Sequence, residues 1–547
     1  MGGTKDRRRN RTHTRTTRQV LMSTYNLTST ILGAGILSLP FAFRESGIIY
    51  GVLMLILTAI LSNFSCGLVL SAYVWTHKAS YGDLAGKIFG KSTQIAVETV
   101  VMLLNVGACA AYILVIKELM PPALAQLLPS AFESFDPSLL TAILVFGVVL
   151  PLCCLRDISS LRFTSMLAFG FAVFLVIAVA VRSIQDMVSR EKVICDVAYE
   201  SDGILGIFRA LPLFSFSYIC HLNVLPVYEF LKSRSPARMR RVFGLAMVFV
   251  TVLYVVTGTF GSLRFCEASP GNILGFPGQG DASCGHFEAD DALITVARLA
   301  QTLTCTLALP LIVLPTRYAL HSLIWDHFMV AIRSVCTKKR TQRNRAESVD
   351  GNAYRRMPRI STDRMADLTR LERESSSHGG LVVLSQDEDE DEVGSPSVIQ
   401  SPPTERRTPM KQPLLSLEDP EDNEDGAVQD DDDKTCSFLK GPFMSQLLES
   451  LAIIGTSFAI AMTVPGVNVA FGLIGATLCT IVCYILPAMF YLGATSSHAS
   501  DAKFGTRLYI RRALSRLLIV YGVCTGILGT SITVWESFVK DESSDCT

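Results

Sequence analysis

The chain is dominated by apolar segments that are each long enough to cross a bilayer. A membrane-spanning helix needs about 20 apolar residues, and about eleven segments of this kind can be counted. They are centred near Gly33, Leu61, Leu104, Val148, Phe171, Ser217, Val250, Thr306, Ser457, Thr480 and Ile519. Of the 547 residues, 49% are hydrophobic and 18% charged, which is typical of a polytopic membrane protein. Since hydrocarbon offers no partners for backbone groups, we expect these segments to be helices.

Basic residues gather in alternate loops between these segments. They occur in the leader, then after the second, fourth, sixth and tenth segments, while the intervening loops contain few. By the positive-inside rule the N-terminus is predicted to be cytosolic, and an odd number of spans places Thr547 on the opposite side. The basic leader runs into the first span without a small-residue cleavage site, so we expect no signal peptide.

A polar stretch divides the predicted spans into two groups. It contains QDEDEDE from Gln386 and QDDDDK from Gln429, and such charge blocks cannot form a packed core. We expect it to be a solvated linker or a docking region for cytosolic regulators; basic and acidic residues interleave without aromatics, so no nucleic-acid motif is present. The predicted organisation is a basic cytosolic tail (1–19), transmembrane helices 1–8 (20–333), a disordered acidic cytosolic loop (334–440), transmembrane helices 9–11 (441–537) and an extracytosolic tail (538–547).

The first span contains residues that disfavour a continuous helix. Gly33, Ala34, Gly35 and then Pro40 stand in its apolar run. A glycine inside a helix costs roughly 1 kcal/mol and a proline about 3 kcal/mol. One interpretation is a helix opened at mid-membrane, whose free N–H groups face an anionic group of a transported molecule. The other is a packing face of small residues that lets two helices approach closely.

The sixth span repeats this pattern. Between residues 203 and 230 it contains Pro212 and Pro226, fourteen residues apart, on either side of Ser217 and His221. We therefore predict helix breaks at the three prolines, Pro40, Pro212 and Pro226. Interrupted spans at matching positions of two halves are typical of a substrate site at the interface between inverted repeats.

Six sequence blocks resemble one family of membrane proteins. They are NLTSTILGAGILSLPFAF from Asn26, NVGACAAYILVIKEL from Asn105, PLCCLRDISSLRFTS from Pro151, FSYICHLNVLPVYEFL from Phe216, VARLAQTLTCTLALPLIVLPTR from Val296 and GLIGATLCTIVCYILPAMFYL from Gly472. The chain resembles the amino acid/auxin permease family, and within it the sodium-coupled neutral and the vacuolar amino acid transporters. The resemblance implies a leucine-transporter-like fold, with a 5+5 inverted repeat and broken helices 1 and 6. It also implies secondary active amino acid transport by alternating access.

An amino acid substrate makes the two interrupted spans a candidate binding site. Its α-carboxylate would face the N–H groups of Gly33, Ala34 and Gly35, where a side chain would block backbone approach. Its α-ammonium would face carbonyl groups freed in the sixth span. Three aromatic residues there are candidates to line the substrate pocket, or are ordinary packing residues: Phe214, Phe216 and Tyr218.

The resemblance leaves the coupling ion open between protons and sodium. Sodium-coupled members use an asparagine in span one and a hydroxyl in span eight; Ser29 and Thr306 occupy those places here. With serine in place of the asparagine, the sequence is more similar at this position to the vacuolar members, which are proton-coupled or exporting. His221 is the candidate proton acceptor, because histidine titrates near neutral pH and buried ionisable groups are usually functional. Its alternative role is to bond a neighbouring backbone group.

The fifteen cysteines show no metal-ligand spacing, so we predict no metal site. Cys266 and Cys284 lie in one loop on the predicted extracytosolic side, where thiols oxidise, and they are a candidate disulfide or two free thiols.

Three classes of function remain. The sequence favours a secondary active transporter of neutral amino acids, without a cofactor apart from co-transported protons or sodium. The alternative is a membrane amino acid sensor that signals through its cytosolic loop, and a channel ranks third. An enzyme is not predicted, because no catalytic motif stands in its required context. The plasma membrane and a vacuolar or lysosomal membrane are both open.

Overall fold

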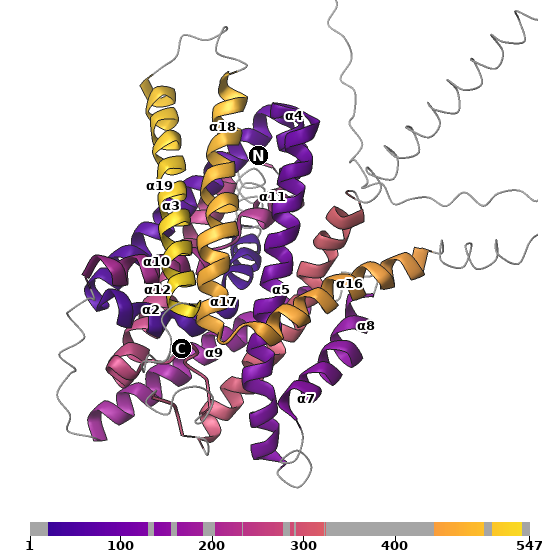
Figure 1. Cartoon of the computed structure of the whole chain (residues 1–547). Helices are drawn as coiled ribbons and strands as arrows, with labels where there is room; N and C mark the ends of the chain where they lie inside the picture. The colour runs from indigo at the N-terminus through magenta and orange to yellow at the C-terminus, as the bar shows by residue number, and fades with distance from the viewer. Residues whose placement is uncertain are drawn as a thin grey trace, which may run out of the picture. The chain divides into compact units, whose positions relative to one another are not determined.

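The structure is a computed structural model that describes residues 20–128, 136–154, 161–189, 203–231, 234–276, 285–288, 291–321, 323, 442–496 and 506–538. Helices and their connections make up all of these residues, and no strand occurs among them (Figure 1). The predicted all-α fold class is therefore confirmed. The predicted acidic loop (334–440), the N-terminal tail (1–19) and residues 539–547 of the C-terminal tail lie outside the described residues.

Nine helices in the described part of the chain are long and apolar enough to span a membrane. They begin with α3 (Ile48–Thr76), α5 (Lys91–Leu127), α9 (Leu161–Ser189), α10 (Gly203–Ser217, continued after a break by α11, Val224–Phe230), α12 (Pro236–Phe265) and the helix Ala292–His321. They end with α16 (Pro442–Thr463), then α17 (Val467–Ile474) with its continuation α18 (Leu486–Ser496), and α19 (Thr506–Phe538).

Two further apolar elements complete the match to the predicted segments. Helix Val20–Ile31 and the residues Ala34–Ser46 form a pair bent by 54°. A shorter apolar stretch, Pro137–Cys153, comprises α7 (Pro137–Leu144), a π-helical turn and α8 (Leu150–Cys153). Ten of the eleven predicted centres fall within one of these elements or the nine helices, and the eleventh, Gly33, lies at the bend between Val20–Ile31 and Ala34–Ser46. The count of eleven spans and the inverted repeat remain predictions, because the strict length test gives nine or ten.

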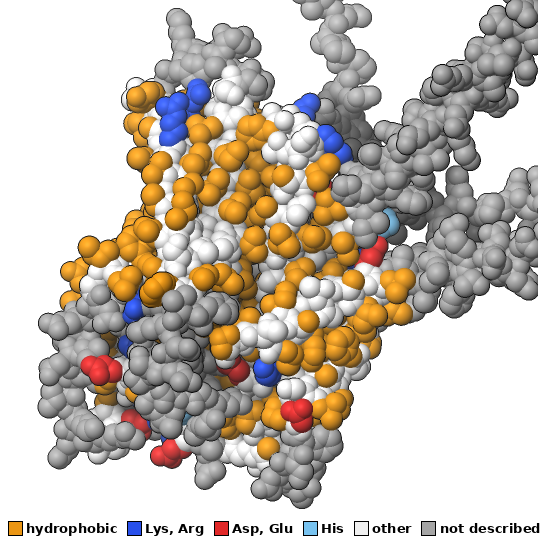
Figure 2. Space-filling view, viewed as in Figure 1, with side chains coloured by type: hydrophobic (Ala, Val, Ile, Leu, Met, Phe, Trp, Pro, Cys, Tyr) orange, Lys and Arg blue, Asp and Glu red, His pale blue; other side chains and the backbone are white. Residues whose placement is uncertain are grey.

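The outer surface of the helices is apolar along most of its height. On α19, Leu517, Val520 and Ile527 are each more than half exposed. Figure 2 shows hydrophobic side chains covering the middle of this face, with most of the visible Lys and Arg at its upper end and most of the Asp and Glu, beside smaller patches of Lys or Arg, toward its lower end. An exposed apolar surface of this extent is unfavourable in water and favourable in lipid. The chain is thus a multi-pass integral membrane protein.

Helix α10 lies in the interior of the bundle. Every residue from Ala210 to Ser217 is buried, and the helix contacts α2 (Leu39–Ser46), α17 and α19. This stretch of the span has no lipid-facing surface, so its polar groups must be satisfied by other helices. This placement puts the second predicted break at the centre of the protein.

Candidate functional site

The first span is interrupted at Leu32 and Gly33. Helix Val20–Ile31 ends there, and after Gly33 the chain forms a 3-10 helix, η1 (Ala34–Ser38), before α2 begins. The Gly33 N–H bonds the Ile31 carbonyl at 2.7 Å. Pro40 lies in the first turn of α2, where a helix needs no N–H donor. The predicted break at Pro40 is therefore wrong in position, because this proline helps to start the helix that follows the break.

The sixth span is interrupted between α10 and α11. Tyr218 to Cys220 are not helical, and a 3-10 turn, η5 (His221–Asn223), leads into α11. Pro212 lies inside the continuous α10 and Pro226 near the start of α11, so the breaks predicted at these prolines are also misplaced. The helix opens instead where other side chains satisfy the freed carbonyl groups, which is the condition for a break in a membrane.

One tyrosine joins the two breaks. The Tyr254 hydroxyl, from α12, lies 2.8 Å from the Ile31 carbonyl oxygen and 2.9 Å from that of Ser217. These two carbonyls end the helices that precede the breaks, and such groups need a donor when they are buried. The Ser217 hydroxyl adds contacts to the carbonyl oxygens of Leu213 (2.8 Å) and Gly35 (3.2 Å). The two interruptions thus face each other directly.

Both predicted glycines permit close approach at the first break. A Cβ atom at Gly33 would lie 2.5 Å from the Tyr112 hydroxyl oxygen. At Gly35 it would lie 2.9 Å from the Ser217 Oγ and 3.0 Å from the Ser217 Cα. The backbone N–H of Ala34 is within hydrogen-bonding reach of the same Tyr112 hydroxyl. The glycines therefore serve helix packing in this structure, because Tyr112 and Ser217 already fill the space that a side chain would need.

The three predicted aromatic residues surround the second break and are all buried. Phe214 makes an edge contact with Phe43, with ring centroids 5.9 Å apart. Phe216 stacks on Phe471 at 4.5 Å. The Tyr218 hydroxyl lies 2.7 Å from the Thr251 hydroxyl. Each residue thus has a packing role, and all three border the interruption.

The predicted coupling residues differ in their surroundings. The Ser29 hydroxyl donates to the Asn26 carbonyl (2.9 Å), and the Thr306 hydroxyl donates to the Thr302 carbonyl (2.8 Å). Both hydroxyls therefore bond their own helices. His221 is fully buried, and neither of its ring nitrogens has a hydrogen-bond partner among the described residues. The Ser62 carbonyl oxygen lies near the ring but outside hydrogen-bond geometry, so the predicted bond to a neighbouring backbone group has a partner at hand without being closed.

An ion pair connects the half-helices beside the two breaks. Glu45 on α2 bonds Arg209 on α10 at 3.0 Å and its neighbour Arg44 at 2.6 Å. The Glu45 side chain is only 2% exposed. Sequence reasoning did not identify this pair; two charges at the ends of otherwise apolar segments were the signal for it. The pair and the Phe43–Phe214 contact hold α2 and α10 together.

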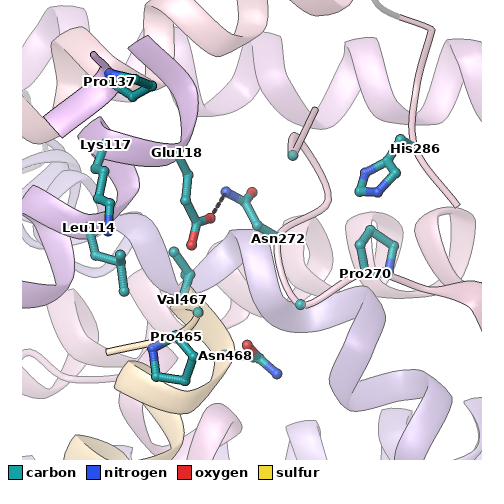
Figure 3. Close-up of a pocket in the computed structure, with 13 residues that line it drawn as sticks. Leu114, Lys117, Glu118, Pro137, Pro270, Asn272, His286, Pro465, Val467 and Asn468 are labelled. Atoms are coloured by element: carbon teal, nitrogen blue, oxygen red, sulfur yellow. Dashed lines mark hydrogen bonds between the residues drawn. The ribbon is translucent and has the colours of Figure 1, made fainter. Parts of the chain in front are cut away.

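A cavity of about 230 Å³ adjoins the segment that follows α12 (Figure 3). The Glu118 carboxylate accepts a hydrogen bond from the Asn272 amide at 2.7 Å, and Lys117, Asn468 and His286 also line the cavity. Burial, reinforced by the nearby positive charge of Arg298, holds the pKa of His286 below its usual 6.5, so its ring is neutral at physiological pH. This cavity was not predicted, because its walls come from segments far apart in the sequence.

The first break and this cavity are connected through η1. The Ser38 hydroxyl donates to the carbonyl oxygen of Gly271, which lines the cavity, at 2.8 Å. The Ile273 N–H donates to the Leu37 carbonyl at 3.0 Å. The segment after α12 is therefore hydrogen-bonded to the end of η1. Cys266, at the start of this segment, is disulfide-bonded; its predicted partner, Cys284, lies outside the described residues, so the pairing remains a prediction.

Two buried, interrupted spans that face each other within a polytopic helical bundle are typical of membrane transporters. The chain belongs to the family of transmembrane amino acid transporter proteins, whose family model matches residues 16–535. This confirms the resemblance found in the sequence blocks.

Individual relatives are more distant. The chain is 28% identical over 303 residues to "Solute carrier family 38 member 10" of Mus musculus. The match covers 55% of this chain and 26% of that protein, so the chain spans about a quarter of its length. Among solved structures, it is similar to a Na+-coupled sialic acid symporter, with a TM-score of 0.40, 10% identity and coverage of 96% and 91% of the two chains. It is also similar to a mutant manganese transporter of Eremococcus coleocola, with a TM-score of 0.39, 10% identity and coverage of 94% and 95%.

Proposed function

We propose that the protein is a secondary active transporter of neutral amino acids, and that the two facing breaks form its substrate site. Family membership supports amino acid transport. The observation that carries the site is the Tyr254 hydroxyl, which lies within hydrogen-bonding distance of one carbonyl from each break. Backbone groups opened deep inside a helical bundle need polar partners, and a zwitterion supplies partners for both N–H and C=O groups.

The proposed binding mode assigns each end of the substrate to one kind of backbone group. The α-carboxylate faces the N–H groups around Gly33 and Gly35, at the start of a half-helix whose dipole favours a negative charge. The α-ammonium replaces the Tyr254 hydroxyl as donor to the carbonyls of Ile31 and Ser217. Binding then requires Tyr254 to turn away, so that occupancy of the site is coupled to the packing of α12.

Alternating access is proposed to move α2 and α10 as one body. The Glu45–Arg209 pair and the Phe43–Phe214 contact join these half-helices. Paired segments beside both breaks would tilt together and open the site to one side at a time. The coupling ion is a proton or sodium: Ser29 and Thr306 are the candidate sodium ligands, and His221 is the candidate proton acceptor.

Transport is tested by reconstituting the purified full chain in proteoliposomes. Neutral amino acids are screened as radiolabelled substrates under an imposed proton gradient and, separately, an imposed sodium gradient. We expect saturable uptake of at least one neutral amino acid that depends on one of the two gradients. The Gly35→Val variant should lose this uptake, because its side chain meets the Ser217 backbone.

The matched control is Gly244→Val on α12, where a Cβ atom would meet nothing within 4 Å. It should transport as the wild type does. Unchanged uptake in Gly35→Val would contradict the site assignment. A wild-type protein that binds an amino acid but shows no flux under either gradient would contradict transport and favour a sensor.

A further inference from the structure

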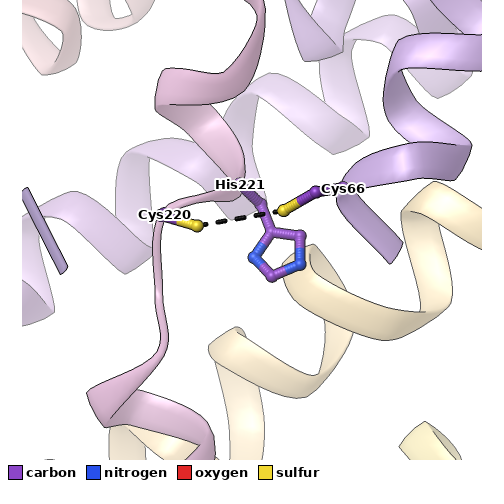
Figure 4. A group of neighbouring side chains, drawn as sticks. All are labelled: Cys66, Cys220 and His221. Atoms are coloured by element: carbon purple, nitrogen blue, oxygen red, sulfur yellow. Dashed lines mark hydrogen bonds between the residues drawn. The ribbon is translucent and has the colours of Figure 1, made fainter. Parts of the chain in front are cut away.

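Three side chains with metal-binding atoms converge at the break in the sixth span. Cys66 comes from α3, and Cys220 and His221 come from the interrupted segment between α10 and α11. Their ligand atoms all lie within 4.8 Å of one another, and all three residues are buried. Figure 4 shows the His221 ring beside the line that joins the two sulfur atoms. Because 154 positions separate Cys66 from Cys220, the sequence spacing gave no sign of this cluster.

The distance between the sulfur atoms fits a tetrahedral metal centre. The two Sγ atoms are 3.8 Å apart. Zinc binds thiolate sulfur at about 2.3 Å in a tetrahedral arrangement, which places two such sulfurs about 3.8 Å apart. A pair of thiols sharing one hydrogen bond also meets this distance. The nearby histidine favours the metal centre over the thiol pair, since two thiols can share a hydrogen bond without any imidazole beside them.

The His221 ring is the second observation that indicates a ligand. Both of its nitrogens are buried without a hydrogen-bond partner among the described residues, which is costly in an apolar interior. A metal ion would accept the lone pair of one nitrogen. The Ser62 carbonyl oxygen lies near the ring but outside hydrogen-bond geometry. It is the backbone group available to accept the N–H of the other nitrogen, as partners of metal-bound histidines commonly do.

We propose that Cys66, Cys220 and His221 bind one Zn²⁺ ion, with the fourth coordination position open to water. Binding converts two thiols to thiolates and releases two protons. The resulting Zn(Cys)₂His centre has no net charge, because two thiolates balance the ion and the imidazole is neutral. A neutral centre avoids the large cost of burying an isolated charge at this depth.

The metal would fasten the sixth-span break to a neighbouring helix. Cys66 lies within α3, whereas Cys220 and His221 lie between two half-helices, so one ion would link all three elements. Occupancy would therefore restrict the movement of α11 relative to α3. It would also commit a lone pair of His221 to the metal, which removes this residue from proton coupling while zinc is bound.

Zinc content is the direct test, and it does not depend on transport. The full chain is expressed with zinc in the medium, purified in detergent, desalted, and analysed for metal by mass spectrometry. We expect about one zinc per chain in the wild type. Cys66→Ser, Cys220→Ser and His221→Ala should each lose most of this zinc. Cys109→Ser, which alters a buried cysteine of α5 outside the cluster, should keep it.

Cobalt substitution identifies the ligands without relying on the variants. Zinc is removed with a chelator and replaced by Co²⁺, whose bonds to thiolates give charge-transfer absorption in the near ultraviolet. We expect this band in the wild type and in Cys109→Ser. If a variant fails to give a monodisperse peak in size-exclusion chromatography, the wild-type spectrum still decides whether thiolates bind the metal.

Three outcomes would overturn the proposal. The first is a wild type without stoichiometric zinc and without the cobalt–thiolate band. The second is an adventitious ion only, shown by zinc that survives equally in all three cluster variants. The third is a Cys66–Cys220 disulfide in the purified protein, detected by peptide mapping without reduction, because oxidised sulfurs cannot supply two thiolates.

Discussion

The two interrupted spans differ in how the backbone groups freed at each break find polar partners. The first break consists of residues without polar side chains, so its backbone groups depend on Tyr112 and Tyr254 from other helices. The second break has its own polar side chains, Ser217 and His221, close to the opened backbone. The first break therefore offers a ligand only backbone N–H and C=O groups. The second break offers backbone groups together with the side chains of Ser217 and His221.

The largest expected effect concerns the ion pair that joins the half-helices beside the two breaks. Glu45→Gln removes the charge that neutralises Arg209 in a nearly dry environment. Breaking a buried pair on one side typically costs about 3–5 kcal/mol. We expect a marked fall in the thermal unfolding midpoint of the detergent-solubilised protein. Asp83→Asn on α4 (Tyr81–Phe89), an exposed position, is the control and should unfold as the wild type does.

The next prediction separates the two glycines of the first break. Gly35→Ala brings a methyl group against the Ser217 backbone, which cannot move easily, whereas Gly33→Ala meets only the Tyr112 hydroxyl. Overpacking of this kind costs about 1–3 kcal/mol. We expect both variants to lose uptake and thermal stability. Adding Tyr112→Phe should restore the stability of Gly33→Ala, because the next ring atom is 3.6 Å away, and should not restore Gly35→Ala.

If Tyr112→Phe restored the stability of both glycine variants equally, or of neither, the clash at Gly33 would not be with the Tyr112 hydroxyl alone, and the predicted difference between the two glycines would be wrong. Thermal unfolding is measured for the single and double variants side by side. Tyr112→Phe alone serves as the reference for the lost hydroxyl.

A smaller effect is expected when the link between the two breaks is removed. Tyr254→Phe removes this donor from both carbonyls; the Ile31 carbonyl keeps the Gly33 N–H, whereas the Ser217 carbonyl is left unsatisfied, which costs about 1–3 kcal/mol for a buried group. The proposed binding mode adds a second expectation: the substrate ammonium no longer competes with the hydroxyl, so the KM for uptake should fall. Thr257→Val, which loses only a hydroxyl bond to the Leu253 carbonyl within α12, is the matched variant and should leave KM unchanged. A raised KM in Tyr254→Phe would contradict the exchange of donors.

The smallest stability effect is expected at Thr306. Its hydroxyl bonds the Thr302 carbonyl of its own helix, so Thr306→Val should change the unfolding midpoint little. Uptake is then measured with sodium or choline at fixed pH. A sodium-dependent wild type whose dependence is lost in Thr306→Val would identify this residue as an ion ligand. Unchanged sodium dependence would exclude it.

Hydropathy predicted the helical segments well because membrane insertion depends on local composition. Ten of the eleven predicted centres lie in apolar helices of the structure, and the eleventh, Gly33, lies at the interruption of the first span. The prolines were a poor guide to the positions of the breaks. Pro40 starts α2, where a missing N–H is not needed. Pro212 stays within α10, since a proline inside a membrane helix is tolerated when neighbouring groups satisfy the freed carbonyl.

The sequence by itself determined the class of the protein, its apolar spans and the two spans that do not remain continuous. These properties follow from residues that are close together in the chain. The tertiary structure alone decided that Tyr254 meets both breaks, that Glu45 pairs with Arg209, and that Cys66 lies beside Cys220 and His221. Such contacts depend on how separate helices pack, and no spacing within the sequence shows which of these residues meet.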